Sequence, residues 1–243
     1  MICLFSVNAY STSDQYTIRT EIFFCKYSEG TNYDDVVKYE KKYEKFLRKN
    51  GLKYSKAILT PVIAGETDYD FILWGSWPNG EEMYREYGAY LNDYDNPNEN
   101  PSICSNNVAV INTAARHIRI PREEYDNIQF VEFANCKFTE EASFNELLKI
   151  SAEHESLVEE FGYGGYGVHY LRPYRGFDDA FAYDMIRMAH WYNRETRAEN
   201  VKKGAAMSQF MNDKGISEKY AKHIESCGNR KVFGMEQIYS SVD

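Results

Sequence analysis

The chain has 243 residues and a formal net charge of −9, and 43% of its residues are hydrophobic. This length suits one large domain or two units of about 110 residues, and it is enough to bury a sizeable core. The acidic charge, without a clustered Lys/Arg stripe, argues against a nucleic-acid partner. No stretch reaches the ~20 apolar residues of a membrane span.

The opening segment, residues 1–14, has two interpretations. Residues 2–7 resemble the end of the apolar core of a signal peptide, and Val7-Asn8-Ala9 fits a small-residue cleavage site. The positively charged part of such a peptide is missing from the sequence. The segment is therefore a signal-peptide remnant, which predicts a periplasmic or secreted protein, or an extra first strand, which is compatible with a cytoplasmic one.

Residues 15–114 predict the order strand, helix, strand, strand, helix, strand. Runs of Ile, Phe and Thr indicate strands, and apolar residues at i, i+3, i+4 and i+7 from Tyr33 to Leu47 indicate a helix that stops at Asn50-Gly51. The expected elements are strands at 17–26, 57–63, 69–77 and 108–113, with helices at 33–47 and 81–91.

Residues 127–243 repeat this order after a linker at 115–126 that contains Pro121. Between Asn193 and Cys227 the chain is longer than between Asn79 and Cys104, which predicts a helical insertion. The expected elements are strands at 129–137, 167–173, 183–190 and 232–239, with helices at 144–161 and from Asn193 onward.

The two halves are copies of one unit. Residues 21–51 align without a gap on residues 132–162. Further matches are Tyr69-Asp70-Phe71-Ile72 with Tyr183-Asp184-Met185-Ile186, Trp77-Pro78-Asn79 with Trp191-Tyr192-Asn193, and Cys104 with Cys227. Each copy has the β-α-β-β-α-β order of a ferredoxin-like unit. Its helices cover one face of its sheet, so the other face must be buried against something, and the second copy is the obvious partner. This predicts an α+β fold in which two ferredoxin-like sheets pack face to face as an α/β barrel.

The element order and the duplication resemble the dimeric α/β-barrel superfamily, with both halves fused in one chain over roughly residues 15–240. The superfamily includes cofactor-free monooxygenases, haem-handling enzymes, isomerases and members with no known activity, and the resemblance implies a central cavity. The sequence carries no family-specific catalytic motif, and a fold does not define a function.

Four of the five cysteines occupy equivalent positions in the two copies. Cys25 sits at the end of the first strand of copy one, and Cys104 sits just before its last strand. These strands are antiparallel neighbours in a ferredoxin-like sheet, so the two cysteines should approach each other, and the same holds for Cys136 and Cys227. Two disulfides, Cys25–Cys104 and Cys136–Cys227, are therefore predicted, which suits an oxidising compartment. The alternative is four buried free thiols. No zinc site is expected, because CxxC and His-x3-His spacings are missing from the sequence.

Differences between the copies indicate a candidate site on the second hairpin of copy two. His169, Arg172, Arg187 and His190 stand where copy one has Ala57, Thr60, Leu73 and Ser76. To within two residues of register, the hairpin is expected to place Arg172 opposite Asp184 and His169 opposite Arg187. Such a cluster facing the cavity would bind a carboxylate or an enolate, with His169 or His190 as the general base. The alternative is a salt-bridged hairpin at the sheet edge.

The repeated Trp77 and Trp191, each followed by an Asn two residues later, favour a role in folding, with the Trp packed in a core and Asn79 or Asn193 capping a helix. The alternative is that Trp77, Trp191 and Asn193 bind a ligand in the cavity. Nothing specific supports His169 or His190 as a haem ligand, so no cofactor is expected. His117, His154 and His223 are interpreted as surface residues.

The sequence therefore indicates a protein that binds a small organic molecule. One hypothesis is a cofactor-free enzyme of the monooxygenase or isomerase kind. The other is a non-catalytic binding or interaction module whose cavity is filled. An open cavity that contains His169, Arg187 or His190 would favour the enzyme, and a filled one would favour the module. The sequence does not indicate the oligomeric state.

Overall fold

The first half of the chain forms the predicted ferredoxin-like unit. The computed structural model describes residues 18–95 and 100–241, so residues 1–14 and Cys3 lie outside the described residues. The elements are β1 (Ile18–Tyr27), α1 (Tyr33–Lys49), β2 (Ser55–Ile63), β3 (Phe71–Trp77), α2 (Gly80–Asp93) and β4 (Ser102–Ile118). Because β4 continues to Ile118, the stretch expected as a linker begins as a strand.

The second half repeats the unit with an insertion. After a short 3-10 turn, η2 (Arg122–Glu124), its elements are β5 (Ile128–Phe138), α3 (Phe144–Phe161), β6 (Tyr166–Arg175), β7 (Met185–Trp191), α4 (Arg194–Asp213), α5 (Ile216–Ala221), β8 (Ile224–Cys227) and β9 (Lys231–Ser240). The long α4 followed by α5 accounts for the predicted helical insertion. No helix in the described ranges is long and apolar enough to cross a membrane.

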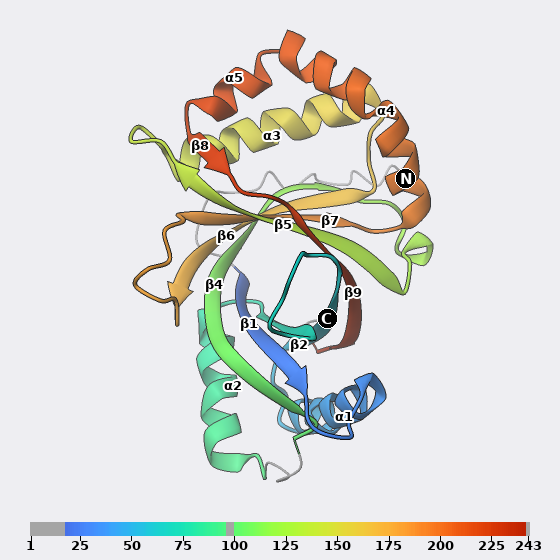
Figure 1. The fold of residues 1–243 in the computed structure, drawn as a ribbon, viewed down its shortest axis with the longest axis vertical. Helices are drawn as coiled ribbons and strands as arrows, with labels where there is room; N and C mark the ends of the chain where they lie inside the picture. Colours follow the sequence, from blue (N-terminus) through green and yellow to red (C-terminus); the bar gives the residue numbers. More distant parts are fainter. Residues whose placement is uncertain (1–17, 96–99, 242–243) are drawn as a thin grey trace, which may run out of the picture.

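The strands close into a barrel. They are hydrogen-bonded in the order β7-β6-β4-β1-β3-β2-β9-β5, and β5 pairs back with β7. The short β8 pairs with the last residues of β5, beyond the stretch that pairs with β9. The last strand of each half pairs with both halves. β4 pairs with β1 of its own half and with β6 of the other. In the same way, β9 pairs with β5 of its own half and with β2 of the other. Figure 1 shows α1 and α2 on one side of the barrel and α3, α4 and α5 on the opposite side. The prediction of a tandem ferredoxin-like α/β barrel is confirmed.

Three hydrophobic cores stabilise this arrangement. One lies between the first sheet and α1 and α2, and the second lies between the other sheet and α3, α4 and α5. The third fills the space between the two sheets with Ile22, Ala57, Leu59, Ile72, Trp74, Val110, Val131, Leu171, Met188 and Phe233. Side chains of the third core therefore lie in the middle of the barrel, where the resemblance implies a central cavity.

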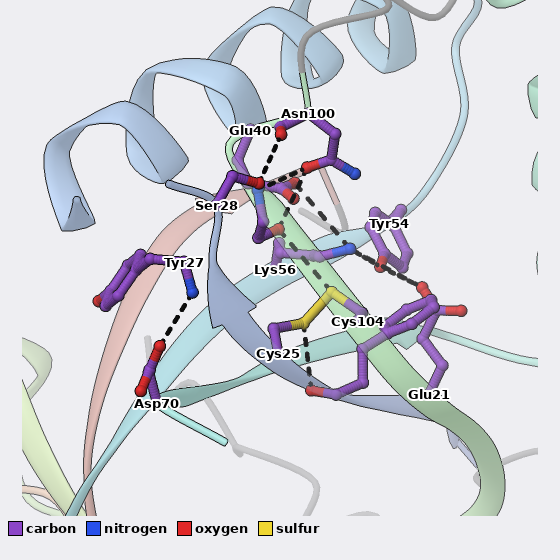
Figure 2. Close-up of a disulfide and its surroundings, with 12 residues drawn as sticks. Glu21, Cys25, Tyr27, Ser28, Glu40, Tyr54, Lys56, Asp70, Asn100 and Cys104 are labelled. Atoms are coloured by element: carbon purple, nitrogen blue, oxygen red, sulfur yellow. Dashed lines mark hydrogen bonds and ion pairs between the residues drawn. A yellow bond between two sulfur atoms is a disulfide. The ribbon is translucent and has the colours of Figure 1, made fainter. Parts of the chain in front are cut away.

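Both predicted disulfides are present. Cys25 is bonded to Cys104 and Cys136 to Cys227, and in each pair the two residues lie directly opposite each other on neighbouring strands. Figure 2 shows the first bond beside the backbone of β1, where the Asp70 carboxylate accepts a hydrogen bond from the Tyr27 N–H at 2.9 Å. Asp184 accepts one from the Phe138 N–H at 2.8 Å, in the same way. Asp184 thus repeats the structural role of Asp70.

Candidate functional site

The hairpin of β6 and β7 does not bring its predicted site residues onto one face. His169 lies opposite Met188, and Arg187 lies opposite Tyr170. The register differs by one residue from the expected pairing, and side chains alternate between the faces of a strand. His169 therefore shares the barrel-facing side with Met188, whereas Arg187 shares the helix-facing side with Tyr170. The observed pairing is within two residues of the expected register, but the one-residue offset places the side chains of His169 and Arg187 on opposite faces of the sheet.

Each of the two hairpin histidines makes its own hydrogen bond to an amide side chain. His169 Nδ1 is 2.9 Å from Asn112 Oδ1, and His190 Nε2 is 2.5 Å from Gln129 Oε1. The ring of His117 packs 5.0 Å from the ring of His169. Burial lowers the pKa of His190 to about 3 and that of His117 to about 4, so both are neutral at pH 7. Their hydrogen bonds satisfy buried polar atoms in a packed region, which favours a structural role.

The other predicted ligand-binding residues also have structural contacts. Trp77 and Trp191 are buried in the two helix-side cores. Asn193 caps α4, because its Oδ1 accepts a hydrogen bond from the Thr196 N–H at 2.8 Å. The guanidinium of Arg172 lies 4.3 Å from the centre of the Phe144 ring. These placements favour the folding interpretation of the repeated Trp and Asn residues.

Two pockets lie on the helix side of the second half. The first, of about 310 Å³, is lined mainly by exposed lysines and glutamates, and some of these pair with each other, as Lys219 does with Glu153 at 2.6 Å. The second, of about 260 Å³, lies between the sheet and helices α3 and α5. Its lining residues are Arg116, Ala134, His154, Tyr170, Arg187, Tyr220, Ile224, Cys227 and Arg230. We call this second pocket the arginine pocket.

Two of the three arginines that line the arginine pocket form no ion pair with a carboxylate in the described part of the chain. Arg116 is only 5% exposed, and its Nε and Nη1 atoms have no hydrogen-bond partner in the described part of the chain. Within the same part, neither Arg116 nor Arg187 forms an ion pair with a carboxylate, while Arg230 approaches Glu132 at 3.6 Å. Burial and then the charge of Arg116 lower the pKa of Arg187. An unpaired buried cation is costly, so this site favours an anion.

A chain of hydroxyl groups connects the other polar residues of the pocket. Ser151 Oγ lies 2.6 Å from Tyr170 Oη and 3.0 Å from Tyr220 Oη. Tyr220 Oη lies 3.4 Å from Nδ1 of His154. Burial, followed by the charges of Arg116 and Arg187, lowers the pKa of His154 to about 3. His154 is therefore a neutral imidazole within reach of a hydrogen-bonded relay.

The first half fills the equivalent space differently. Arg116 on β4 lies opposite Val168, and Tyr239 on β9 lies opposite Lys56, which places Tyr239 at the position equivalent to Arg116. By the sequence alignment, Tyr43 stands for His154 and Leu73 for Arg187. Glu21, Glu40, Lys56 and the surrounding tyrosines make their own buried network here, part of which Figure 2 shows.

Sequence reasoning identified Arg187 but missed most of the pocket. His117 and His154 are largely buried rather than surface residues, and His154 lines the pocket. Residues that differ between the two copies indicate the site, but the differences considered were limited to the β6–β7 hairpin. Extended to α3 and to the last strands, the comparison of the two copies would have shown His154 replacing Tyr43 and Arg116 replacing Tyr239.

No protein-family model matches this chain, and no curated protein sequence matches it. Solved structures do share its fold. A mutant chlorite dismutase from Candidatus Nitrospira defluvii is 10% identical, with a TM-score of 0.50 over 91% of this chain and 92% of that one. A heme-binding protein from Thermus thermophilus is 12% identical, with a TM-score of 0.49 over 92% of this chain and 94% of that one. An anthrone oxidase-like protein is also 12% identical, with a TM-score of 0.46 over 93% of this chain and 94% of that one. At these identities the likeness shows the fold alone.

Proposed function

We propose that this protein binds a small organic anion in the arginine pocket of its second half. The observation that carries the proposal is the buried guanidinium of Arg116, whose Nε and Nη1 atoms have no hydrogen-bond partner in the described part of the chain. A second arginine that forms no ion pair there, Arg187, lines the same pocket. A carboxylate accepts charge-assisted hydrogen bonds from guanidinium groups, and one bound in this pocket would offset the unpaired charges of Arg116 and Arg187.

The rest of the lining supports an anion with an apolar or aromatic body. Ala134 and Ile224 provide apolar surface, and the rings of Tyr170 and Tyr220 provide aromatic surface. The volume of about 260 Å³ lies just below the roughly 300–1,000 Å³ of pockets for drug-sized ligands. The ligand class is therefore a small carboxylate of the size of benzoate or phenylpyruvate.

Haem is a second candidate, because the superfamily that the chain resembles includes haem-handling enzymes. His154 and the arginines have the chemistry to meet an iron and two propionates. The pocket volume of about 260 Å³ is too small for haem. Haem is larger than most drug-sized ligands, whose sites already measure roughly 300–1,000 Å³. The residues present do not fit haem.

The location of the protein belongs to the same proposal. Both disulfides persist only where thiols are kept oxidised, which supports a periplasmic or secreted protein over a cytoplasmic one. The packed interior of the barrel supports the view that its middle serves folding, as in the filled-cavity hypothesis, while binding takes place under the helices.

Calorimetric titration with benzoate, and with the neutral benzamide as its matched control, tests the binding proposal. We expect one benzoate per chain and much weaker binding of benzamide. Arg187→Leu should weaken benzoate binding tenfold or more, because hydrogen bonds to charged groups contribute about 1.5–3 kcal/mol. Arg194→Gln, at an exposed arginine outside the pocket, should leave the affinity unchanged. Equal binding of benzoate and benzamide, or no effect of Arg187→Leu, would contradict the proposal.

A further inference from the structure

We propose that the arginine pocket catalyses proton transfer on a small 2-oxo acid and interconverts its keto and enol forms. This inference rests on the anion site proposed above and adds a reaction to it. It is carried by the arrangement of His154, Tyr220, Ser151 and Tyr170, which form a continuous hydrogen-bonded chain. Three of these residues, His154, Tyr170 and Tyr220, line the same pocket as the two unpaired arginines.

The two arginines suit the two oxygen-bearing groups of a 2-oxo acid. The carboxylate and the keto group sit on adjacent carbons, and negative charge grows on the keto oxygen when a proton leaves the neighbouring carbon. Arg116 and Arg187 offer fixed positive charge in a largely buried site, where it stabilises such a developing enolate more strongly than water does. A simple carboxylate would use only part of this charge.

His154 is the group placed to accept the proton. Its Nδ1 is held by Tyr220, and its Nε2 makes no hydrogen bond with any described residue. The imidazole is neutral at pH 7 because burial, Arg116 and Arg187 disfavour its charged form. A bound anion offsets the charge of both arginines, so ligand binding raises the basicity of His154 at the moment a proton has to be removed.

The proton balance closes within the pocket. The C–H bond beside the keto carbon breaks, its proton goes to His154 Nε2, and its electron pair forms the enolate. Tyr170 gives its hydroxyl proton to the enolate oxygen, which forms the O–H bond of the enol. Ser151 and Tyr220 pass a proton from His154 Nδ1 to Tyr170, and exchange with water returns the imidazole to its starting tautomer. No redox partner is needed.

The first half lacks this chain. Tyr43 stands at the position of His154 and Glu40 at that of Ser151. Tyr43 hydrogen-bonds to Glu86, and Glu40 approaches Lys56 at 3.9 Å, so these residues are used within a buried network. The reaction is accordingly expected in the second half.

Deuterium exchange tests the inference with phenylpyruvate as the probe. The protein with intact disulfides is mixed with phenylpyruvate in D₂O, and loss of the methylene proton signal is followed by NMR. We expect wild type to accelerate exchange at least 100-fold over buffer, in the range usual for general-base catalysis. His154→Gln should remove this acceleration while phenylpyruvate affinity changes less than threefold. His223→Gln, at a histidine outside the arginine pocket, should exchange like wild type.

The outcomes separate this inference from the binding proposal. If benzoate and phenylpyruvate bind but exchange stays at the buffer rate, the site binds anions without catalysing proton transfer, and the inference is overturned. Exchange by His154→Gln at the wild-type rate would overturn it too, as would benzoate binding without phenylpyruvate binding. If neither ligand binds, the binding proposal fails as well. Tyr170→Phe should slow enol formation, seen by ultraviolet absorbance, more than it slows exchange, which a merely structural tyrosine would not do.

Discussion

Arg187 and Leu73 occupy equivalent positions in the two halves but have opposite chemistry. Arg187 faces a pocket where Arg116 is its charged neighbour, while Leu73 packs in the first helix-side core. Replacing Arg187 by Leu removes a largely buried, unpaired charge. We expect Arg187→Leu to raise the free energy of unfolding by about 1 kcal/mol while it weakens benzoate binding. Urea unfolding measures the first effect and calorimetry the second; a clear loss of stability would show that Arg187 is part of the scaffold instead.

Glu86 is a buried carboxyl whose ionisation opposes folding. Burial raises its pKa to about 7, despite the hydrogen bond from Tyr43. The unfolded chain ionises this group near pH 4.3, so its contribution to stability is lost as the pH rises from about 4.5 to about 7. Glu86→Gln should therefore gain stability over wild type by up to about 3 kcal/mol between pH 5 and pH 8.

Urea unfolding at pH 5, 6.5 and 8 measures the difference in unfolding free energy between Glu86→Gln and wild type. The contributions of the other titrating groups largely cancel in this difference, because both proteins contain them. Glu81→Gln, at an exposed position on the same helix, is the matched control and should follow wild type at each pH. A stability difference between Glu86→Gln and wild type that does not change with pH would show that Glu86 ionises normally in the folded protein.

At the scale of the elements, β8 connects a disulfide to the arginine pocket. β8 ends at Cys227, which is bonded to Cys136 on β5, and Ile224 and Cys227 both line the pocket. Replacing Cys136 and Cys227 together by Ser should release this strand. We expect a loss of stability, about 4 kcal/mol in the chain-entropy model, and a clear loss of benzoate affinity. Unfolding curves and calorimetric titration measure the two effects.

The first disulfide provides the control for that experiment. It closes a segment of similar length, 79 against 91 residues, but lies in the other half, away from the pocket lining. The double change Cys25→Ser and Cys104→Ser should cost comparable stability and leave benzoate affinity near that of wild type. If both double variants lose affinity equally, β8 has no particular role in shaping the pocket.

The order of the elements was predictable because each element occurs twice in the sequence, so the pattern in one copy supports the assignment in the other. Cys25 pairs with Cys104 at the place the alignment implies, and Asn79 and Asn193 both cap helices. The strand register was not predictable, since the loop between β6 and β7 does not determine it. A difference of one residue from the expected register places His169 and Arg187 on opposite faces of the sheet. Tyr220 belongs to the insertion, which has no counterpart in the first half to compare it with.

For the whole molecule, the exchanged last strands make the two halves interdependent. β4 leaves its own half to pair with β6, and β9 pairs with β2. Arg116 lies on the part of β4 that has crossed over, so the first half of the chain supplies a residue to the pocket of the second. A unit made only of residues 127–243 lacks this strand and this arginine, and it exposes the sheet face that the barrel buries.

This interdependence predicts how the protein responds to a cut between its halves. A protease site introduced between Ile118 and Ile128 lies after the last residue of β4 and before the first of β5. We expect the nicked chain to run as one particle in size-exclusion chromatography and to bind benzoate as before, because the β4–β6 and β2–β9 ladders and the core between the sheets still join the fragments. Residues 127–243 expressed alone should be poorly folded and should not bind benzoate. Two separately folded halves after the cut, or a second half that binds on its own, would show that the barrel is not the cooperative unit.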